Sequence, residues 1–210
     1  MIRVMIADDH AIVRKGMRLI VADQPGIEIC GEAGDYGELM RLLRTGACDV
    51  LLLDIGMPGK NGIDILKIVR EQHPDTRVLI LSMYPEDQYA IRALKAGALG
   101  YLTKDSAPER LVEAIQTVAR GRRYITASIA DMLASHLTGH GDAPPHERLS
   151  DREFQTMRLI ASGQQLSQIA ETLSLSPKTI SVYRARVLEK MGLKNNSEIT
   201  HYALKNGLTE

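Results

Sequence analysis

The sequence predicts an α/β domain built around a parallel sheet, followed by a smaller all-helical domain. Short apolar runs of about 3 to 7 residues, a length typical of strands, alternate five times with amphipathic helix-like stretches in residues 1–120. Strict alternation of this kind favours a parallel sheet covered by helices on both faces. The runs are almost continuously apolar, which agrees with burial on both faces. After residue 121 the alternation ends and only helical patterns remain.

The expected elements follow from these runs. Strands are expected at residues 2–7, 27–33, 50–53, 78–81 and 100–102. Helices are expected at about residues 10–23, 36–44, 62–73, 86–96, 107–120 and 127–137. The segment 138–148 contains two glycines and two adjacent prolines, so it cannot build a core and predicts a linker. We therefore divide the chain into residues 1–122, a linker with one helix at 123–147, and residues 148–210.

The composition narrows the class of protein. Acidic and basic side chains number 26 each, so the net charge is zero and bulk charge favours no partner. No apolar run approaches the roughly 20 residues that a membrane helix needs, and the N-terminus is typical of a strand, not of a signal peptide. Cys30 and Cys48 are not spaced as a CxxC pair, which predicts buried, reduced thiols. We therefore expect a soluble, cytoplasmic protein with no membrane partner.

Polar side chains follow four of the five expected strands. Asp8 and Asp9 follow the first strand, Asp54 the third, Ser82 the fourth and Lys104 the fifth. In an open parallel sheet the carboxyl ends of the strands share one edge, where ligands bind. Topology alone therefore brings three carboxylates, a hydroxyl and an ammonium group together.

This combination suits metal-dependent phosphoryl chemistry. Three acids repel one another, and Mg²⁺, which prefers carboxylate oxygens, relieves that repulsion. A carboxylate beside such an ion can attack phosphorus and form an aspartyl phosphate. We expect Asp54 to be this nucleophile, because it ends a wholly apolar strand that fixes its side chain. Lys104 would offset the charge of the phosphoryl group, Ser82 would hydrogen-bond it, and the backbone carbonyl of Gly56 can face the metal.

Structural explanations stay open for single residues of this set. An Asp after a strand is often a turn residue or a helix N-cap, so Asp9 could simply cap the first helix. Lys104 alone would be a solvated charge, and His10 is typical of an exposed residue at a helix start. No HxxxH motif or Cys/His cluster indicates zinc. Four strand ends that carry compatible chemistry favour one common site over coincidence.

The motifs at the strand ends resemble those of a known family. ADDH, LLLDIGMPGKNG, LILSMY and GYLTKD, in this order, resemble the receiver domain of bacterial two-component response regulators. The resemblance covers roughly residues 1–120. It implies a flavodoxin-like sheet with the strand order 2-1-3-4-5 and phosphoryl transfer from a histidine kinase to Asp54.

The resemblance also implies roles for the site residues. Mg²⁺ would be held by Asp8, Asp9, Asp54 and the backbone of Gly56, with Asp9 as a direct ligand. The phosphate would be contacted by Ser82 and Lys104. Tyr101 resembles the switch aromatic of the family, which turns inward as Ser82 moves toward the phosphate. The alternative for Tyr101 is an ordinary half-buried aromatic residue of a strand.

Residues 148–210 show the pattern of a helix-turn-helix domain. Ser150 precedes Glu153 by three residues, the spacing of a capping box at a helix start. A second, short helix lies around Ile169. Ser176-Pro177 then begins a third helix, with serine as the cap and proline at the first position. A short helix, a tight turn and a longer helix form the motif whose second helix enters the major groove of DNA.

Local charge supports this interpretation. Residues 174–194 hold five basic side chains and one acidic side chain, a net charge of +4, whereas residues 1–148 carry −2. Such a basic stripe suits contacts with DNA phosphates. Taken alone, it is more often a solvated helix face, and it favours DNA binding only together with the paired helices.

The helical domain resembles a second family. LSDREFQTMRLIASG, QIAETLSLSPKTI and VLEKMGLKNNSEI resemble the LuxR-type output domain of the NarL/FixJ regulators, over about residues 147–208. The resemblance implies that the residues facing DNA are Lys178, Thr179, Ser181, Val182, Arg184, Ala185 and Arg186. By their chemistry, the candidates for phosphate contacts are Lys178, Thr179, Arg186 and Lys190. The candidates for contacts with base edges are Ser181, Val182 and Ala185.

These patterns together predict a DNA-binding response regulator of a two-component system. It would accept a phosphoryl group from a histidine kinase on Asp54, bind double-stranded promoter DNA and form a homodimer when phosphorylated. One rival is a phosphohydrolase with an aspartyl nucleophile, but such enzymes often carry an acid two residues later, where this chain has Gly56. We therefore expect no enzyme beyond slow, Mg²⁺-dependent self-dephosphorylation. A second rival is a binding module that works unphosphorylated, against which the complete set of acids, serine and lysine argues.

Overall fold

The computed structural model describes residues 1–58, 60–106, 108–138 and 144–209. The chain forms two compact units, Met1–Gly139 and His140–Glu210, and the boundary between them along the chain falls in the segment predicted to be a linker. Parts of three predicted segments lie outside the described residues: Gly59 in the loop after the third strand, Ala107 at the start of the fifth helix, and 139–143 in the linker.

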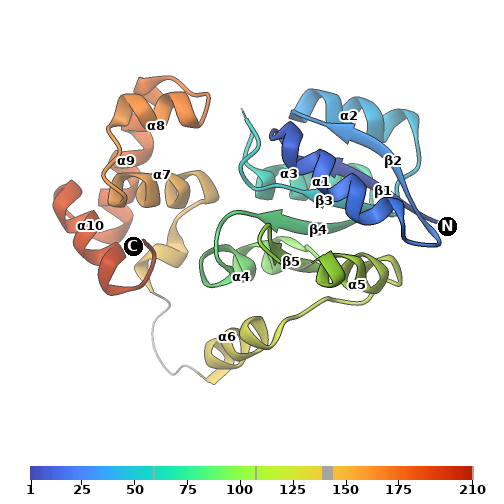
Figure 1. The fold of residues 1–210 in the computed structure, drawn as a ribbon. Helices are drawn as coiled ribbons and strands as arrows, with labels where there is room; N and C mark the ends of the chain where they lie inside the picture. Colours follow the sequence, from blue (N-terminus) through green and yellow to red (C-terminus); the bar gives the residue numbers. More distant parts are fainter. Residues whose placement is uncertain (59, 107, 139–143, 210) are drawn as a thin grey trace. The chain divides into compact units, whose positions relative to one another are not determined.

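The first unit is built on a five-stranded parallel sheet (Figure 1). The strands are β1 Ile2–Ala7, β2 Ile27–Ala33, β3 Val50–Leu53, β4 Arg77–Ser82 and β5 Gly100–Thr103. Their order is β2-β1-β3-β4-β5, and every neighbouring pair is parallel, which confirms the predicted topology. Because β1 and β3 lie side by side at its centre, the ends of these two strands are brought together.

Helices cover both faces of this sheet. They are α1 Ala11–Ala22, α2 Tyr36–Thr45, α3 Gly62–Gln72, α4 Glu86–Ala96 and α5 Pro108–Ala119. Helices α1 and α5 pack on one face, where Met17 and Ile115 join the core formed by alternate strand residues such as Ile6 and Leu52. Helices α2, α3 and α4 supply apolar side chains to the other face, to which the intervening strand residues point.

The helix starts show why these segments are helical. The side chain of Asp35 accepts a hydrogen bond from the backbone N–H of Glu38, and that of Asn61 accepts one from Ile63. Each satisfies a backbone donor that the first turn of a helix leaves without a partner. The N-cap residue of α1 is His10, which makes no side-chain cap. The alternative interpretation of Asp9 as this cap is therefore wrong.

A further helix follows the sheet in the same unit. Helix α6, Ala127–Thr138, packs against α4, and Ile129 on it is fully buried. The segment before α6 is tied to the sheet, because Tyr124 forms a parallel bridge with Gly100. Thr126 Oγ1 donates a hydrogen bond of 2.9 Å to Glu86 Oε2 at the start of α4.

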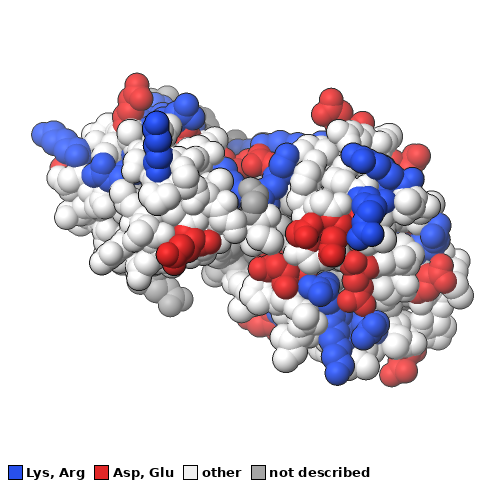
Figure 2. Space-filling view, turned by 90° about the horizontal axis from the view of Figure 1, so that it is seen from above, with Lys and Arg blue, Asp and Glu red and all other residues white. Residues whose placement is uncertain are grey.

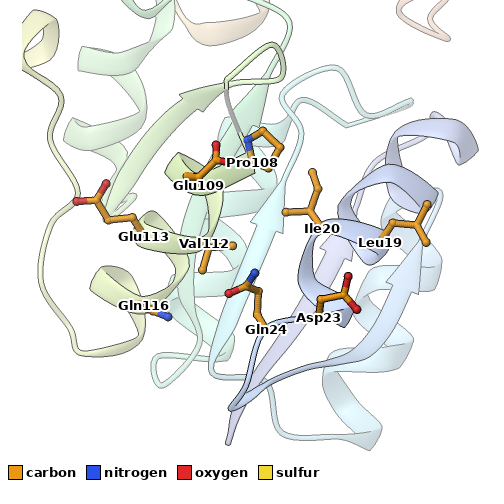
Figure 3. Close-up of a pocket in the computed structure, with 9 residues that line it drawn as sticks. All are labelled: Leu19, Ile20, Asp23, Gln24, Pro108, Glu109, Val112, Glu113 and Gln116. Carbon is orange, nitrogen blue, oxygen red and sulfur yellow. The ribbon is translucent and has the colours of Figure 1, made fainter.

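A groove of about 420 Å³ lies between α1 and α5 (Figure 3). Ile20 and Val112 line it together with Leu19, a residue that is 63% exposed. Three carboxylates border the groove. Glu109 and Glu113 lie on α5, and Asp23 directly follows α1. This face therefore presents apolar side chains beside acidic ones.

The cysteines differ in exposure. Cys48 is buried and Cys30 is half-buried, so the prediction of two buried thiols holds fully only for Cys48. Burial raises the pKa of Cys48 to about 12, and burial also raises the pKa of Cys30. Both thiols therefore resist ionisation, as expected for structural cysteines.

The second unit is all-helical. It consists of a 3₁₀ helix at Pro145–Arg148, α7 Asp151–Ala161, α8 Leu166–Thr172, α9 Pro177–Met191 and α10 Asn196–Lys205. The predicted capping box is present, since Ser150 Oγ accepts from the N–H of Glu153 and a Glu153 carboxylate oxygen accepts from the N–H of Ser150. Helix α9 begins after Ser176 with Pro177, and it ends at Gly192 in the left-handed conformation, with φ of 66°.

The 3₁₀ helix lies within the predicted linker segment 138–148, where the sequence suggested no folded structure. His146 Nδ1 lies 2.8 Å from the hydroxyl of Tyr202, and the His146 ring lies 6.1 Å from the ring of Phe154. These contacts join Pro145–Arg148 to the helices of the second unit.

Within the described ranges, no helix is both long enough and apolar enough to cross a bilayer.

Candidate functional site

Three carboxylates meet at the carboxyl ends of β1 and β3. Asp8 and Asp54 are buried, with 0% and 4% of their surface exposed, whereas Asp9 is exposed. One oxygen from each of these acids and a ring nitrogen of His10 lie within 4.8 Å of one another. The N–H of Asp54 donates to the carbonyl of Ala7, so the backbone itself links the two strand ends. The structure thus places the predicted acids in one cluster.

Lys104 compensates the two buried acids. Its Nζ lies 2.6 Å from Asp8 Oδ2 and 3.0 Å from Asp54 Oδ2, and its side chain is only 4% exposed. Its backbone N–H donates to the carbonyl of Ser82, which fixes the loop after β5 against the end of β4. Lys104 is therefore part of the site, and the alternative of a solvated charge is wrong.

The pKa values of Asp54 and Lys104 result from two opposing effects: burial disfavours the charged form of each group, and the opposite charge of its neighbour favours it. Burial raises the pKa of Asp54, and the repulsion of Asp8 adds to this effect, while Lys104 opposes it. Burial alone would lower the pKa of Lys104, but Asp54 and Asp8 outweigh it and the pKa is raised. Two carboxylates share one ammonium group, so negative charge at this edge is not fully offset, and a further cation would be stabilised there.

Ser82 and Tyr101 are connected through Tyr84. Ser82, at the end of β4, is fully buried, and its Oγ accepts a hydrogen bond of 3.2 Å from the N–H of Tyr84. Tyr101 on β5 is also fully buried, and its hydroxyl donates to the carbonyl of Tyr84 at 2.7 Å. Tyr101 is thus not a half-buried strand aromatic, because its ring lies inside the unit and its hydroxyl holds the loop that follows Ser82.

Gly56 lies directly against the nucleophile candidate. Hydrogen bonding to the backbone of Gly56 acts against burial and lowers the pKa of Asp54. A Cβ at this position would lie 3.0 Å from Asp54 Oδ2, so any side chain would crowd the carboxylate. The small residue keeps the carboxylate accessible from this side.

His10 is closer to the acids than the sequence suggested. It stands at the helix start and its side chain is 61% exposed, as predicted, but its Nδ1 lies 2.7 Å from Asp9 Oδ1 and 3.3 Å from Asp8 Oδ1. Its backbone N–H also donates to Asp8 Oδ1 at 2.9 Å. The only signal in the sequence is its position directly after two acids. A second residue that the sequence did not indicate is Arg14, whose Nη1 donates to the carbonyl of Asp8 at 2.6 Å.

The candidate DNA-contacting residues lie on α9. Its buried side is formed by Ile180, Val187 and Met191. The exposed candidates are Lys178, Ser181, Val182, Ala185, Arg186 and Lys190, and the half-exposed ones are Thr179 and Arg184. In the view of Figure 2, Lys and Arg side chains are interspersed with Asp and Glu on both units. The local excess of basic charge on α9 is therefore a more specific indication of DNA binding than the net charge of the whole chain.

Some of these polar groups already have partners within the second unit. Arg184 Nε donates to Asn196 Oδ1 at 2.6 Å, and Ser181 Oγ donates to the carbonyl of Pro177 at 2.9 Å. Lys190 Nζ donates to Glu153 Oε2 at 2.6 Å. Lys190 therefore has a structural partner, which the sequence pattern did not reveal.

Comparison with known proteins decides the family. The family described as "Response regulator receiver domain" matches residues 4–116, and that described as "Bacterial regulatory proteins, luxR family" matches residues 147–203. The response regulator UvrY of Escherichia coli (strain K12) is 38% identical over 209 residues, which cover 99% of this chain and 96% of UvrY. The chain belongs to the NarL/FixJ family of response regulators.

Other relatives are similar to this response regulator over nearly its whole length. GacA of Pseudomonas aeruginosa is 35% identical over 212 residues, covering 100% of this chain and 99% of GacA. A structure of RcsB from Salmonella typhimurium has a TM-score of 0.73 at 27% identity and covers 98% of each chain. RcsB bound to promoter P1flhDC in the presence of phosphomimetic BeF3⁻ has a TM-score of 0.68 at 29% identity, covering 96% of this chain and 97% of that chain. This response regulator thus combines a receiver domain with a LuxR-type DNA-binding domain and regulates transcription.

Proposed function

We propose that Asp54 is the phosphoacceptor of a cytoplasmic transcription regulator and that a histidine kinase supplies its phosphoryl group. The observation that carries this proposal is the ammonium group of Lys104 held between Asp8 and Asp54 at the sheet edge. A buried lysine at this point can follow the negative charge when a phosphoryl group arrives. The membership of the receiver family supports the same assignment.

The chemistry is a nucleophilic displacement at phosphorus. One carboxylate oxygen of Asp54 attacks the phosphorus atom of a phosphohistidine, the P–N bond breaks, and the imidazole leaves with the electron pair. Lys104 would then lie near the phosphoryl oxygens and offset part of their charge. Ser82, whose Oγ accepts from the N–H of Tyr84, would donate its hydroxyl proton to one of those oxygens.

The acid cluster fits Mg²⁺. Three of its four donors are carboxylates, and hard oxygen ligands of this kind are those that Mg²⁺ prefers. We propose that Asp8, Asp9, Asp54 and the backbone of Gly56 hold the ion. When bound, it would neutralise charge between the incoming phosphoryl group and Asp54.

We also propose that the protein is not an enzyme that turns over phosphoesters. Gly56 occupies the position where an aspartyl phosphohydrolase often has its second acid, so the site has no carboxyl group there to protonate a leaving alcohol. Self-dephosphorylation by water remains as a slow reaction that resets the regulator.

For the output we propose that α9 enters the major groove of promoter DNA. Phosphate contacts would come from Lys178, Thr179, Arg186 and Lys190, and Arg184 would also face the DNA. Base contacts would come from Ser181, Val182 and Ala185. A homodimer of the phosphorylated chain would present two such helices, in line with the RcsB structure that contains two dimers on two parallel DNAs. The apolar and acidic groove between α1 and α5 (Figure 3) is the surface we propose for contact with the kinase.

One experiment tests the central assignment. The full chain is incubated with Mg²⁺ and a small phosphodonor, and its intact mass and its affinity for promoter DNA are compared with those of Asp54→Asn. We expect a gain of one phosphoryl group and tighter DNA binding in the parent protein only. An unchanged parent mass would contradict the proposal, and a mass gain that leaves DNA binding as in Asp54→Asn would favour a regulator that works unphosphorylated.

A further inference from the structure

His10 brings a nitrogen donor to an otherwise all-oxygen site. Its Nδ1 lies 2.7 Å from Asp9 Oδ1 and 3.3 Å from Asp8 Oδ1, and it shares the 4.8 Å cluster with Asp54. The oxygens of the acid pocket explain a preference for Mg²⁺ without any contribution from the imidazole. The ring belongs to a residue whose side chain caps no helix.

The spacing matches neighbouring ligands on one ion. For metal–ligand bonds of about 2.1 Å in octahedral geometry, adjacent ligand atoms lie roughly 3 Å apart. The separations of Nδ1 from the two carboxylate oxygens, 2.7 and 3.3 Å, fall on either side of that value. The N–H of His10 also donates to Asp8 Oδ1, which holds the backbone of His10 beside the acids. Nδ1 of this exposed ring therefore lies close enough to the acid oxygens to share an ion with them.

A nitrogen ligand changes which ions a site prefers. Mg²⁺ favours oxygen donors and keeps its waters, whereas Mn²⁺, Co²⁺ and Zn²⁺ accept imidazole readily. We propose that His10 is a further protein ligand for first-row transition-metal ions at this site and that it raises the preference of the receiver for Mn²⁺ or Co²⁺ over Mg²⁺. The inference rests on the proposed function only in taking Asp8, Asp9 and Asp54 as the shared metal ligands.

The same proximity has a simpler explanation that the test must separate. A protonated His10 would be an ion-pair partner of Asp9, and a cation bound at the acids would have to displace it. In that case removal of the imidazole would help every divalent ion equally or affect none. In the proposed case removal harms the transition-metal ions and spares Mg²⁺.

The test measures metal binding directly. Dissociation constants for Mn²⁺, Co²⁺ and Mg²⁺ are determined by titration calorimetry at about pH 8, where a free imidazole is neutral, for the full chain, His10→Ala and His201→Ala. His201 is exposed on α10, so its variant controls for loss of an unrelated histidine. We expect His10→Ala to weaken Mn²⁺ and Co²⁺ by at least about tenfold and Mg²⁺ by less than about twofold. Equal changes for all three ions, or no change, would overturn the proposal.

A spectroscopic readout identifies the ligand atom. Pulsed EPR of bound Mn²⁺ should show coupling to a ¹⁴N nucleus in the parent protein and in His201→Ala, and the coupling should be absent in His10→Ala. Bound Mn²⁺ without nitrogen coupling in the parent would refute the role of His10 while leaving the phosphoacceptor proposal intact. Failure of Asp9→Asn and Asp54→Asn to weaken any of the ions would instead contradict the metal site of the proposed function.

Discussion

Lys104 is a single side chain on which the acid pocket depends. It is buried and is the ammonium partner of both Asp8 and Asp54, at 2.6 and 3.0 Å. Removing one partner of a buried ion pair is costly because the remaining charges stay buried without compensation. Lys104→Met should therefore lower the free energy of unfolding by about 3 kcal/mol in urea denaturation without metal.

The matched control for this variant is Lys67→Met. Lys67 lies on α3, is 54% exposed and is 3.9 Å from Asp64, so its replacement should change stability by less than about 0.5 kcal/mol. Added Mg²⁺ should restore part of the stability of Lys104→Met, because it supplies the missing positive charge. Equal effects of the two substitutions would show that Lys104 does not compensate the pocket.

Replacing Asp54 should stabilise the protein, whereas replacing Lys104 should destabilise it, and the effect at Asp54 should depend on pH. Its pKa is raised in the folded protein, mainly by burial, so the unfolded chain releases this proton at lower pH than the folded chain. Folding therefore loses stability as pH rises from the ordinary value of 3.8 through the folded-state pKa, and the loss persists above it. Lys104 does not titrate in this window, because its pKa is raised from 10.5.

Without metal, Asp54→Asn should accordingly melt at a higher temperature than the parent at neutral pH. The difference should shrink toward zero as the pH falls below about 4. Asp64→Asn, a change of an acid in the first turn of α3 whose side chain is 41% exposed, is the control and should not show the rise in melting temperature that burial gives Asp54→Asn. Thermal unfolding followed by circular dichroism at several pH values measures the difference, and a constant offset at every pH would contradict the burial argument.

At the scale of elements, backbone packing places the nucleophile as much as side chains do. Helix α3 begins at Gly62, where an added Cβ would collide with the carbonyl oxygen of Asp54 and lie 2.6 Å from the Cα of Ile55. The N–H of Gly62 also donates to the carbonyl of Ile55. The first turn of α3 thus rests directly on the backbone that carries Asp54.

Gly62→Ala should therefore destabilise the receiver by about 3 kcal/mol and reduce phosphorylation, because overpacking against backbone cannot be relieved by a rotamer change. Gly16→Ala is the matched control. Gly16 lies within α1 and an added Cβ would meet nothing within 4 Å, so this change should stabilise by roughly 0.5–1 kcal/mol. Urea denaturation distinguishes the two, and similar stabilities would refute the close packing of α3.

Helix α9 allows a test of two basic residues with different surroundings. Lys190 donates to Glu153 Oε2, whose side chain is only 2% exposed, whereas Arg186 is exposed. Burial would raise the pKa of Glu153, but the hydrogen bonds from Lys190 and Ser150 outweigh it and the pKa is lowered. This carboxylate therefore contributes stability above its ordinary pKa of 4.5, and the contribution is lost as pH falls through the folded-state value.

We expect Lys190→Met to lower the free energy of unfolding by roughly 1.5–3 kcal/mol at neutral pH and by less in acid. Arg186→Met should leave stability within about 0.5 kcal/mol but reduce the salt dependence of DNA binding by about one unit of slope. Filter binding at several salt concentrations and chemical denaturation give the two quantities. Unchanged stability of Lys190→Met would contradict the role of its contact with Glu153, whatever the effect of this substitution on DNA binding.

The elements were largely predictable from sequence, whereas the long-range contacts were not. Strands β1, β2 and β3 match their predicted ranges, and β4 and β5 differ by one residue at their ends, because buried parallel strands are continuous apolar runs. The strand order came from the family resemblance. The 3₁₀ helix at Pro145–Arg148 was missed, because its contact between His146 and Tyr202 joins residues 56 positions apart. Local composition carries no information on such a contact.

At the site, too, the sequence predicted the residues that follow the strands but not their long-range contacts. Asp8, Asp54 and Lys104 follow from one rule, that parallel strands share their carboxyl edge. The ring of His10 does not, because its direction depends on the loop between β1 and α1, which no periodic pattern describes. Lys190 was expected only on the DNA-facing surface, since Glu153 lies 37 residues earlier in the chain.

At the scale of the whole molecule, regulation must connect two compact units. One unit, Met1–Gly139, contains the receiver, and the other, His140–Glu210, contains the DNA-binding domain. Within the receiver, the contacts run from Ser82 through Tyr84 to Tyr101, and α6 at its end is tied to α4 by Thr126 and Glu86. Phosphorylation of Asp54 shifts the equilibrium between two conformations of these contacts only to the extent that the phosphoryl group interacts more favourably with one conformation than with the other.

The proposed dimer makes a geometric prediction for DNA. Two chains related by a two-fold axis present two α9 helices to half-sites about one turn, roughly 10 base pairs, apart. The phosphorylated full chain should bind a selected two-half-site DNA at least about tenfold more tightly than a single half-site. Inserting about 5 base pairs between the half-sites turns the second one to the opposite side of the helix and should abolish that gain, whereas about 10 should restore much of it. Asp54→Asn, treated with the same phosphodonor, should show little gain at any spacing, and an affinity of the phosphorylated protein that ignores spacing would rule out a symmetric dimer as the DNA-binding form.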